Sequence, residues 1–276
     1  MMIKKKVQRA KKSKVTAHCC SSKTAGELLP VPSTREERAK VERETFFLSK
    51  KIGRATTDYH MINDGDKILV AVSGGKDSIS MLRLLEHRRS FVPIKYELIA
   101  VHIDMGYGCV QQDLLKKYFE THGFRYHFEK LDMLKGKDRS SISCFWCAWN
   151  RRKALFQLAD KYGCKKVALG HHKDDIVETI LLNLFFNAEI SAMAPKQELF
   201  EGKLTIIRPL AYIEEKELIR YGRSSGFPHP LCSCPNSSKS QRAKVGEIIE
   251  GLEKACPHVK SNIFNSVKNI KKDYLV

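Results

Sequence analysis

The sequence predicts an α/β fold with a doubly wound parallel sheet, and three observations lead to this prediction. Short apolar runs rich in β-branched residues alternate along the chain with longer segments of helical periodicity. These runs show little polar alternation, as expected for strands that helices cover on both faces. One run, 67–72, leads directly into two glycines and a helical pattern. A strand, a glycine turn and a helix in this order are typical of a phosphate site at the carboxyl edge of such a sheet.

The expected elements follow one another from residue 34 to the carboxyl end of the chain. Thr34 can cap a helix of mixed charge that extends to residue 59, and the turn residues 63–66 separate it from the first strand. Strands are expected at 67–73, 97–103, 125–128, 166–169 and 204–208. Helices are expected at 78–88, 111–121, 150–161, 174–186, 214–225 and 240–254, with a last helical piece after Pro257.

These elements divide the chain of 276 residues into four segments. Residues 1–34 form a basic arm without apolar periodicity, which we expect to be disordered and which can contact nucleic acid or act as a targeting signal. Residues 35–64 form an N-terminal helix, and 65–230 hold the sheet and its phosphate loop. Residues 231–276 contain a cysteine loop and a C-terminal helical extension.

The chain carries a formal net charge of +18. Eight basic residues precede the first acid, Glu27, and the remainder still carries +10 without them. A charge excess that survives removal of the arm favours a polyanionic partner such as RNA or DNA, although a solubilising surface with a basic tail also explains it. No apolar run is long enough for a membrane span and no secretory signal is recognisable, so we expect an intracellular, cytoplasmic protein.

The candidate phosphate loop consists of Ser73, Gly74, Gly75, Lys76, Asp77 and Ser78. Paired glycines allow a sharp turn that brings backbone N–H groups close to an anion, and the lysine adds a full charge. The commoner phosphate loop is excluded, because Val70 stands where its first glycine should be and Asp77 follows the lysine. The motif instead resembles the pyrophosphatase loop of enzymes that cleave ATP between its α and β phosphates. The alternative is a glycine turn that binds nothing.

Acidic residues and histidines follow two other strands at the same predicted edge. Asp104 ends the second strand, where a carboxylate can reach ribose hydroxyls, the base edge or a metal. The fourth strand runs into residues 170–175, in which His171 can donate to a phosphate or to a developing oxyanion. Asp174 and Asp175 can hold Mg²⁺ or support the reacting group. Helix capping by Asp174, with Asp175 in the first turn, is the structural alternative.

Nine cysteines, an odd number without an export signal, argue against a disulfide framework. Cys144 and Cys147 open a helix in a Cys-x-x-Cys spacing that can share one metal, and Cys232 and Cys234 follow later. Three of these thiols would hold a cubane iron–sulfur cluster with one open iron, whereas all four would close a structural zinc site.

Several motifs resemble, in the same order, those of the bacterial tRNA 2-thiocytidine synthetases, which are ATP pyrophosphatases of the PP-loop superfamily. The resemblance covers residues 45–250 and rests on the run 53–78, the Cys-x-x-Cys with Arg151 and Arg152, the stretch 168–175, Met193 to Lys196, Ile207 to Tyr212, and Cys234 through Gln241 and Arg242.

The resemblance implies an adenine nucleotide α-hydrolase-like PP-loop fold in residues 65–230 and a tRNA sulfurtransferase that uses ATP, Mg²⁺ and a [4Fe-4S] cluster. ATP adenylates the C2 oxygen of an anticodon-loop cytidine, and sulfur then replaces that oxygen. Further partners would be a sulfur donor such as a cysteine desulfurase and a second copy in a homodimer. The implied catalytic residues are Asp77, His171 and Asp175, the implied ATP-binding residues are Ser73 to Ser78, Asp104 and Gly170, and the implied cluster ligands are Cys144, Cys147 and Cys234.

Two alternatives to this interpretation stay open at the level of sequence. The first is thiolation of a tRNA uridine by the same chemistry. The second is an RNA-binding protein without enzymatic activity, in which Cys144, Cys147, Cys232 and Cys234 hold a structural zinc. Metal analysis after anaerobic preparation separates the cluster from the zinc.

Overall fold

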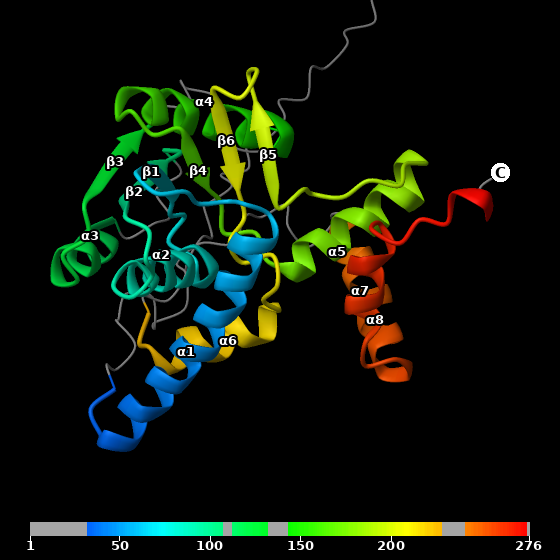
Figure 1. Cartoon of the computed structure of the whole chain (residues 1–276), viewed down its shortest axis with the longest axis horizontal. Helices are drawn as coiled ribbons and strands as arrows, with labels where there is room; N and C mark the ends of the chain where they lie inside the picture. The colour runs from blue at the N-terminus through cyan, green and yellow to red at the C-terminus, as the bar shows by residue number, and fades with distance from the viewer. Residues whose placement is uncertain (1–31, 107–111, 132–142, 228–240, 275–276) are drawn as a thin grey trace, which may run out of the picture.

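A six-stranded sheet forms the centre of the computed structural model, which describes residues 32–106, 112–131, 143–227 and 241–274 (Figure 1). Across the sheet the strands follow the order β3-β2-β1-β4-β6-β5. Their bounds are β1 Asp66–Ala71, β2 Tyr96–Asp104, β3 Tyr126–Lys130, β4 Lys166–Ala168, β5 Lys196–Leu199 and β6 Leu204–Ile207. The five strands predicted from the sequence are all present, each within a few residues of its predicted bounds.

The predicted parallel sheet is confirmed, with one edge strand added. β1, β2, β3, β4 and β6 pair in parallel, whereas β5 runs antiparallel to β6. Residues 196–199 are three polar residues followed by a single leucine, and all four are partly or fully exposed. Such a short polar strand lacks the apolar run that reveals the buried strands, which is why the sequence analysis did not predict it.

The helices occur in the predicted order. Their bounds are α1 Arg35–Asp58, α2 Lys76–Arg89, α3 Gln112–Thr121, α4 Cys144–Lys161, α5 Lys173–Leu182, α6 Glu215–Ser224, α7 Gln241–Ala255 and α8 Val259–Ser266. Thr34 caps α1 in a capping box with Glu37, as its position before the helix predicts. The helix expected at 150–161 begins at Cys144, because Ser143 caps it by accepting from the Trp146 N–H.

Helices cover both faces of the sheet. On one face α1, α2, α3 and α6 share a continuous apolar cluster with β1 and β2, and on the other face α4 packs over β1, β2 and β4. A third cluster joins α5, α7 and α8, which stand beside the sheet (Figure 1). None of the helices in the described ranges combines the length and the apolar character needed to cross a membrane.

The strand order reverses at β1, which pairs with β2 on one side and with β4 on the other. Val70 of β1 lies opposite Ala168 of β4, so the loops that follow these two strands leave the same edge side by side. In open parallel sheets such a switch point opens a crevice for ligands. The candidate phosphate loop and the stretch 170–175 both lie here.

Candidate active site

Residues 73–78 fold into a compact turn that delivers the chain into α2. Gly74 has a φ of +89°, a conformation that residues with a side chain rarely adopt. The Ser78 hydroxyl accepts from the Ser73 N–H at 3.1 Å and donates to the Gly75 carbonyl at 2.9 Å. Gly75 is the N-cap of α2 and supplies no side chain to the first amides of the helix. The positive end of α2 is therefore open to an anion.

Lys76 lies between two carboxylates. Its Nζ donates to Glu215 Oε1 at 2.8 Å and to Asp77 Oδ2 at 3.3 Å. Burial acts to lower the pKa of Lys76, but the hydrogen bond to Glu215 and the charge of Asp77 outweigh it and raise the pKa above its ordinary value. Lys76 is a fixed cation beside the open helix end.

One carboxylate oxygen of Asp77 is available to bind a ligand. Its Oδ1 atom is buried and has no hydrogen-bond partner among the described residues. Burial raises the pKa of Asp77, and the charge of Lys76 opposes this shift. A buried, unpaired carboxylate oxygen next to a phosphate site fits a divalent cation, which prefers oxygen ligands of this kind.

Gly170 brings the turn after β4 into contact with the phosphate loop. A Cβ atom at this position would lie 3.1 Å from the backbone N and Cα of Ser78. Glycine is therefore required for the close approach of two backbones, and the close approach sets the spacing between the loop and residues 171–175.

His171 and Arg208 form a buried pair at the ends of β4 and β6. The Arg208 Nε donates to His171 Nδ1 at 3.4 Å, and its Nη1 donates to the Ala194 carbonyl. Burial lowers the pKa of His171 to about 4 and that of Arg208 to about 10. His171 is thus neutral near pH 7, and because its Nδ1 accepts from Arg208, its proton lies on Nε2. This tautomer can donate, as the sequence analysis expected.

The two carboxylates that follow have different surroundings. His172, not Asp174, is the N-cap of α5, and Asp175 completes its capping box by accepting from the His172 N–H at 3.0 Å. The structural alternative, capping by Asp174, does not occur, because the Asp174 carboxylate accepts instead from the Glu215 N–H at 2.7 Å and from Lys260 at 2.9 Å. Asp175 Oδ1 pairs with the Arg242 guanidinium at 3.0 Å.

Asp104 ends β2 at the same edge, where its Oδ1 accepts from the Gly106 N–H at 2.8 Å. His102, two residues earlier, is buried, and its Nδ1 lies 2.8 Å from the carbonyl of Val72, directly before the phosphate loop. The sequence analysis assigned no role to this histidine. Its position shows that β2 supports the loop through a side chain as well as through the sheet ladder.

Cys144 and Cys147 occupy the first turn of α4, three residues apart. Cys147 is half-buried beside the apolar cluster under α4. Cys232 and Cys234 lie outside the described residues, as do Cys19, Cys20 and Cys109. Among the residues that are described, no group of three His, Cys, Asp or Glu side chains can hold a metal ion.

The described chain stops at Phe227 and resumes at Gln241, on either side of Cys234. Before the gap, Phe227 packs edge-on against Tyr221 of α6, the helix that also carries Glu215. After the gap, Arg242 contacts Asp175 and Glu178 of α5. Phe227 and Arg242, which lie close to either end of the gap, therefore both contact elements of the candidate site.

Besides His102, the sequence analysis did not assign Arg208, Glu215, Arg242 and Lys260 to the site. Arg208 and Arg242 lie inside the quoted motifs, so their presence there was a usable signal. Glu215 and Lys260 lie in ordinary helical patterns, where a charged residue usually indicates a solvated face.

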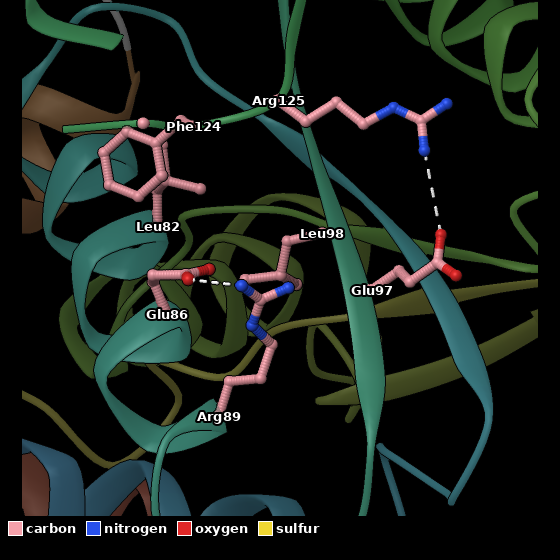
Figure 2. Close-up of a pocket in the computed structure, with 8 residues that line it drawn as sticks. Leu82, Glu86, Arg89, Glu97, Leu98, Phe124 and Arg125 are labelled. Carbon is pink, nitrogen blue, oxygen red and sulfur yellow. Dashed lines mark hydrogen bonds and ion pairs between the residues drawn. The ribbon is translucent and has the colours of Figure 1, made fainter. Parts of the chain in front are cut away.

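A separate hollow, with a volume of about 230 Å³, lies at the amino ends of β2 and β3, away from the phosphate loop (Figure 2). It is lined by Leu82, Glu86, Arg89, Glu97, Leu98, Gly123, Phe124 and Arg125. Ion pairs join Glu86 to Arg89 at 2.6 Å and Glu97 to Arg125 at 3.7 Å across it. These pairs leave no concentrated charge for a nucleotide, and no residue of the predicted site lies there.

Comparison with known proteins shows the family of the chain. The PP-loop domain family matches residues 47–242. A tRNA-cytidine(32) 2-sulfurtransferase of Citrifermentans bemidjiense is 42% identical over 235 residues, which cover 83% of this chain and 92% of that protein. The chain belongs to the tRNA-cytidine(32) 2-sulfurtransferase family. The tRNA-cytidine(32) 2-sulfurtransferase of Geobacter sulfurreducens is 43% identical to this chain, and the match covers 91% of that protein.

Members of the tRNA-cytidine 2-sulfurtransferase family are enzymes, and this chain covers 92% of the length of the relative from Citrifermentans bemidjiense. Among solved structures, the U34-tRNA thiolase NcsA from Methanococcus maripaludis, determined with its [4Fe-4S] cluster, superposes with a TM-score of 0.67. It is 24% identical, and the match covers 83% of this chain and 80% of NcsA. At this identity the likeness shows a shared fold, which confirms the predicted PP-loop architecture.

Proposed function

We propose that this protein thiolates a cytidine in the anticodon loop of tRNA and that it uses ATP to activate the base. The C2 oxygen attacks the α-phosphorus of ATP and pyrophosphate leaves; sulfur then adds at C2, and AMP leaves with the oxygen. The observation that carries the proposal is the open positive end of α2 beside Lys76, at the edge where the cysteine pair of α4 also begins. Activation of the base by ATP and delivery of sulfur would both take place at this edge of the sheet.

The phosphate loop would hold the β and γ phosphates of ATP. The amides that follow Gly74 and Gly75 donate to phosphate oxygens, Lys76 neutralises their charge, and Ser73 and Ser78 keep the turn closed through their hydroxyls, which lie 3.2 Å apart. Asp104 and Gly170 flank the loop from β2 and β4. Asp104 would contact the ribose or the base, and Gly170 would leave room for the nucleotide.

Mg²⁺ would bind first at Asp77, whose unpaired buried oxygen is the best match in the site. Asp175 would contribute only if Arg242 released its Oδ1, because that oxygen now lies in an ion pair. Asp175 is thus suited to a step that follows substrate binding. The cation would polarise the phosphates and stabilise the leaving pyrophosphate.

Cys144, Cys147 and Cys234 would hold the [4Fe-4S] cluster. Thiolates are favoured at the start of a helix, and α4 continues with Arg151 and Arg152, so the donor set suits an anionic cluster. When bound, the cluster would carry the transferable sulfur on the iron that has no cysteine ligand.

His171 would donate from Nε2 to the oxygen that becomes the leaving group at C2. Its neutral state avoids competition with Lys76 for the phosphates, and Arg208 holds it in the donating tautomer. On this proposal the protein works in the cytoplasm with tRNA and receives sulfur from a donor such as a cysteine desulfurase. A homodimer is compatible with it.

The test uses anaerobically prepared, cluster-loaded protein with ATP, Mg²⁺, sulfide and unmodified tRNA. We expect 2-thiocytidine in the digested tRNA by mass spectrometry, with AMP and pyrophosphate in equal amounts. Thiouridine instead would favour the uridine alternative, and zinc without iron or acid-labile sulfide would favour the structural zinc protein. Iron content should fall in Cys234→Ser and stay unchanged in the matched control Cys232→Ser.

A further inference from the structure

The first turns of α4 expose three large aromatic side chains, Phe145, Trp146 and Trp149, which we call the α4 aromatic platform. Their exposed fractions are 80%, 44% and 50%. Trp149 lies four residues after Phe145 and three after Trp146, so the three side chains share one side of the helix. Among the described residues, no other aromatic ring packs against them. Large apolar groups gathered on a surface in this way indicate an interaction site.

The platform lies at the active edge of the sheet. α4 follows β3 in the chain and precedes β4, so its first turns lie toward the carboxyl ends of the parallel strands, the side on which the phosphate loop follows β1. Cys147 turns toward the apolar cluster between α4 and the sheet, whereas Trp146 and Trp149 turn toward solvent. The platform and Cys147 therefore share the same helical turns but lie on different sides of the helix.

Basic side chains border the platform. Arg152 and Lys153 follow Trp149 by three and four residues, which places them next to it on the helix surface. The Lys153 Nζ lies 5.4 Å from the centre of the Trp149 ring. No acidic residue occurs in the first turn of α4, and the first acid of the helix is Asp160. Exposed rings next to uncompensated cations are the combination that binds single-stranded nucleic acid.

We propose that the α4 aromatic platform stacks on unpaired bases of the RNA loop that carries the target nucleotide. This inference rests on the proposed function and names the surface that holds the loop. The rings provide faces for bases, and Arg152 and Lys153 contact the phosphates between them. A protein partner is the less favoured occupant, because the core of a protein interface is depleted of charge, whereas here the cations adjoin the rings.

The test measures binding of a labelled anticodon stem-loop RNA to cluster-loaded protein by fluorescence anisotropy. Trp149→Ala should raise the Kd about tenfold, and Trp149→Phe, which keeps a ring, should restore most of the affinity. The chain has two tryptophans, and both lie in the platform. Intrinsic tryptophan emission should therefore change when the stem-loop binds and stay constant with a duplex of equal length.

The matched control is Phe91→Ala. Phe91 is an exposed ring with the Arg88 guanidinium 5.6 Å from its centre, but it follows α2 at the opposite edge of the sheet. We expect its loss to leave RNA affinity unchanged. Unchanged affinity in Trp149→Ala, an equal response to loop and duplex, or loss of binding to a purified sulfur-donor protein without loss of RNA binding would overturn the proposal. Failure of the proposed function gives a different result from failure of this inference. In that case the RNA would stay unthiolated while the platform still bound the loop.

Discussion

At the scale of single residues, burial decides which charges the site can use. Lys76 stays charged because two carboxylates surround it, whereas His171 stays neutral because burial removes water from its ring. Arg208 adds a second cation, which is buried and lies beside His171. The site therefore combines fixed positive charge with a neutral proton donor, a distribution suited to anionic phosphates and a developing oxyanion.

Lys76→Met should abolish most of the adenylation activity. The methionine keeps the length of the side chain but removes the charge that faces the phosphates, so we expect kcat/KM for AMP formation to fall about 100-fold. Glu215→Gln is the matched control, because it keeps the hydrogen bond to Lys76 and should cost far less. Equal rates in Lys76→Met and the wild type would contradict the assigned role.

His171 should also make stability depend on pH. Its pKa is about 4 in the folded protein and about 6.5 in an unfolded chain, so the folded state binds fewer protons between these values. The free energy of unfolding is therefore highest above pH 6.5 and falls as the pH drops toward 4. From pH 7 to pH 4.5, we expect the free energy of unfolding to fall by about 2–3 kcal/mol less in His171→Gln than in the wild type. Urea titrations at the two pH values measure this difference, and parallel losses would refute it.

At the scale of elements, the site depends on how closely the turn after β4 approaches the start of α2. At Gly170 the two backbones approach so closely that a Cβ atom would lie 3.1 Å from the Ser78 backbone, and the capping box of α5 then fixes the direction of the following helix. The loop and α5 thus form one rigid edge, in which the spacing of backbones determines the spacing of catalytic groups.

Gly170→Ala tests this spacing. The added methyl group would press on the Ser78 backbone, so we expect a loss of about 1–3 kcal/mol in unfolding free energy and a larger loss in AMP formation. Gly246→Ala is the control, since a Cβ there meets no atom within 4 Å and lies inside α7. It should stabilise the protein by about 0.5–1 kcal/mol without changing activity. A neutral Gly170→Ala would mean that the edge is flexible.

At the scale of the whole molecule, ion pairs attach the carboxyl-terminal helices to the active edge. Lys260 of α8 reaches Asp174 and Glu253, each at 2.9 Å, and Arg242 of α7 reaches Asp175. These pairs supplement the apolar cluster of α5, α7 and α8. The extension after the sheet is therefore part of the site.

Lys260→Met should destabilise the molecule by at least about 2 kcal/mol, because it leaves the buried Asp174 carboxylate without its cation. Lys260 is 16% exposed, whereas Lys216, which pairs with Glu214 and Glu253, is 68% exposed. Lys216→Met should therefore cost less than about 1 kcal/mol. Urea unfolding measures both values, and equal losses would show that the buried pair does not hold the extension in place.

Much of the fold could be predicted because its signals are local. The apolar run before Gly74 and Gly75 is contiguous with the glycines, and the spacing of Cys144 and Cys147 lies within one helical turn. β5 escaped prediction because a short edge strand carries no apolar run. The N-cap of α5 could not be decided from the sequence, since Asp174 could cap the helix by itself but is held by Glu215 and Lys260 from distant segments.

The sequence by itself determined the order of strands and helices, the phosphate loop and the type of chemistry, because each depends on residues that are neighbours in the chain. Only the tertiary structure decided that Lys76 pairs with Glu215, 139 positions away, and that Arg208 sets the tautomer of His171. It also decided which carboxylate keeps a free oxygen, at Asp77, and which is already paired, at Asp175. Periodicity cannot reveal such partners, because burial and charge pairing arise only when separate segments pack together.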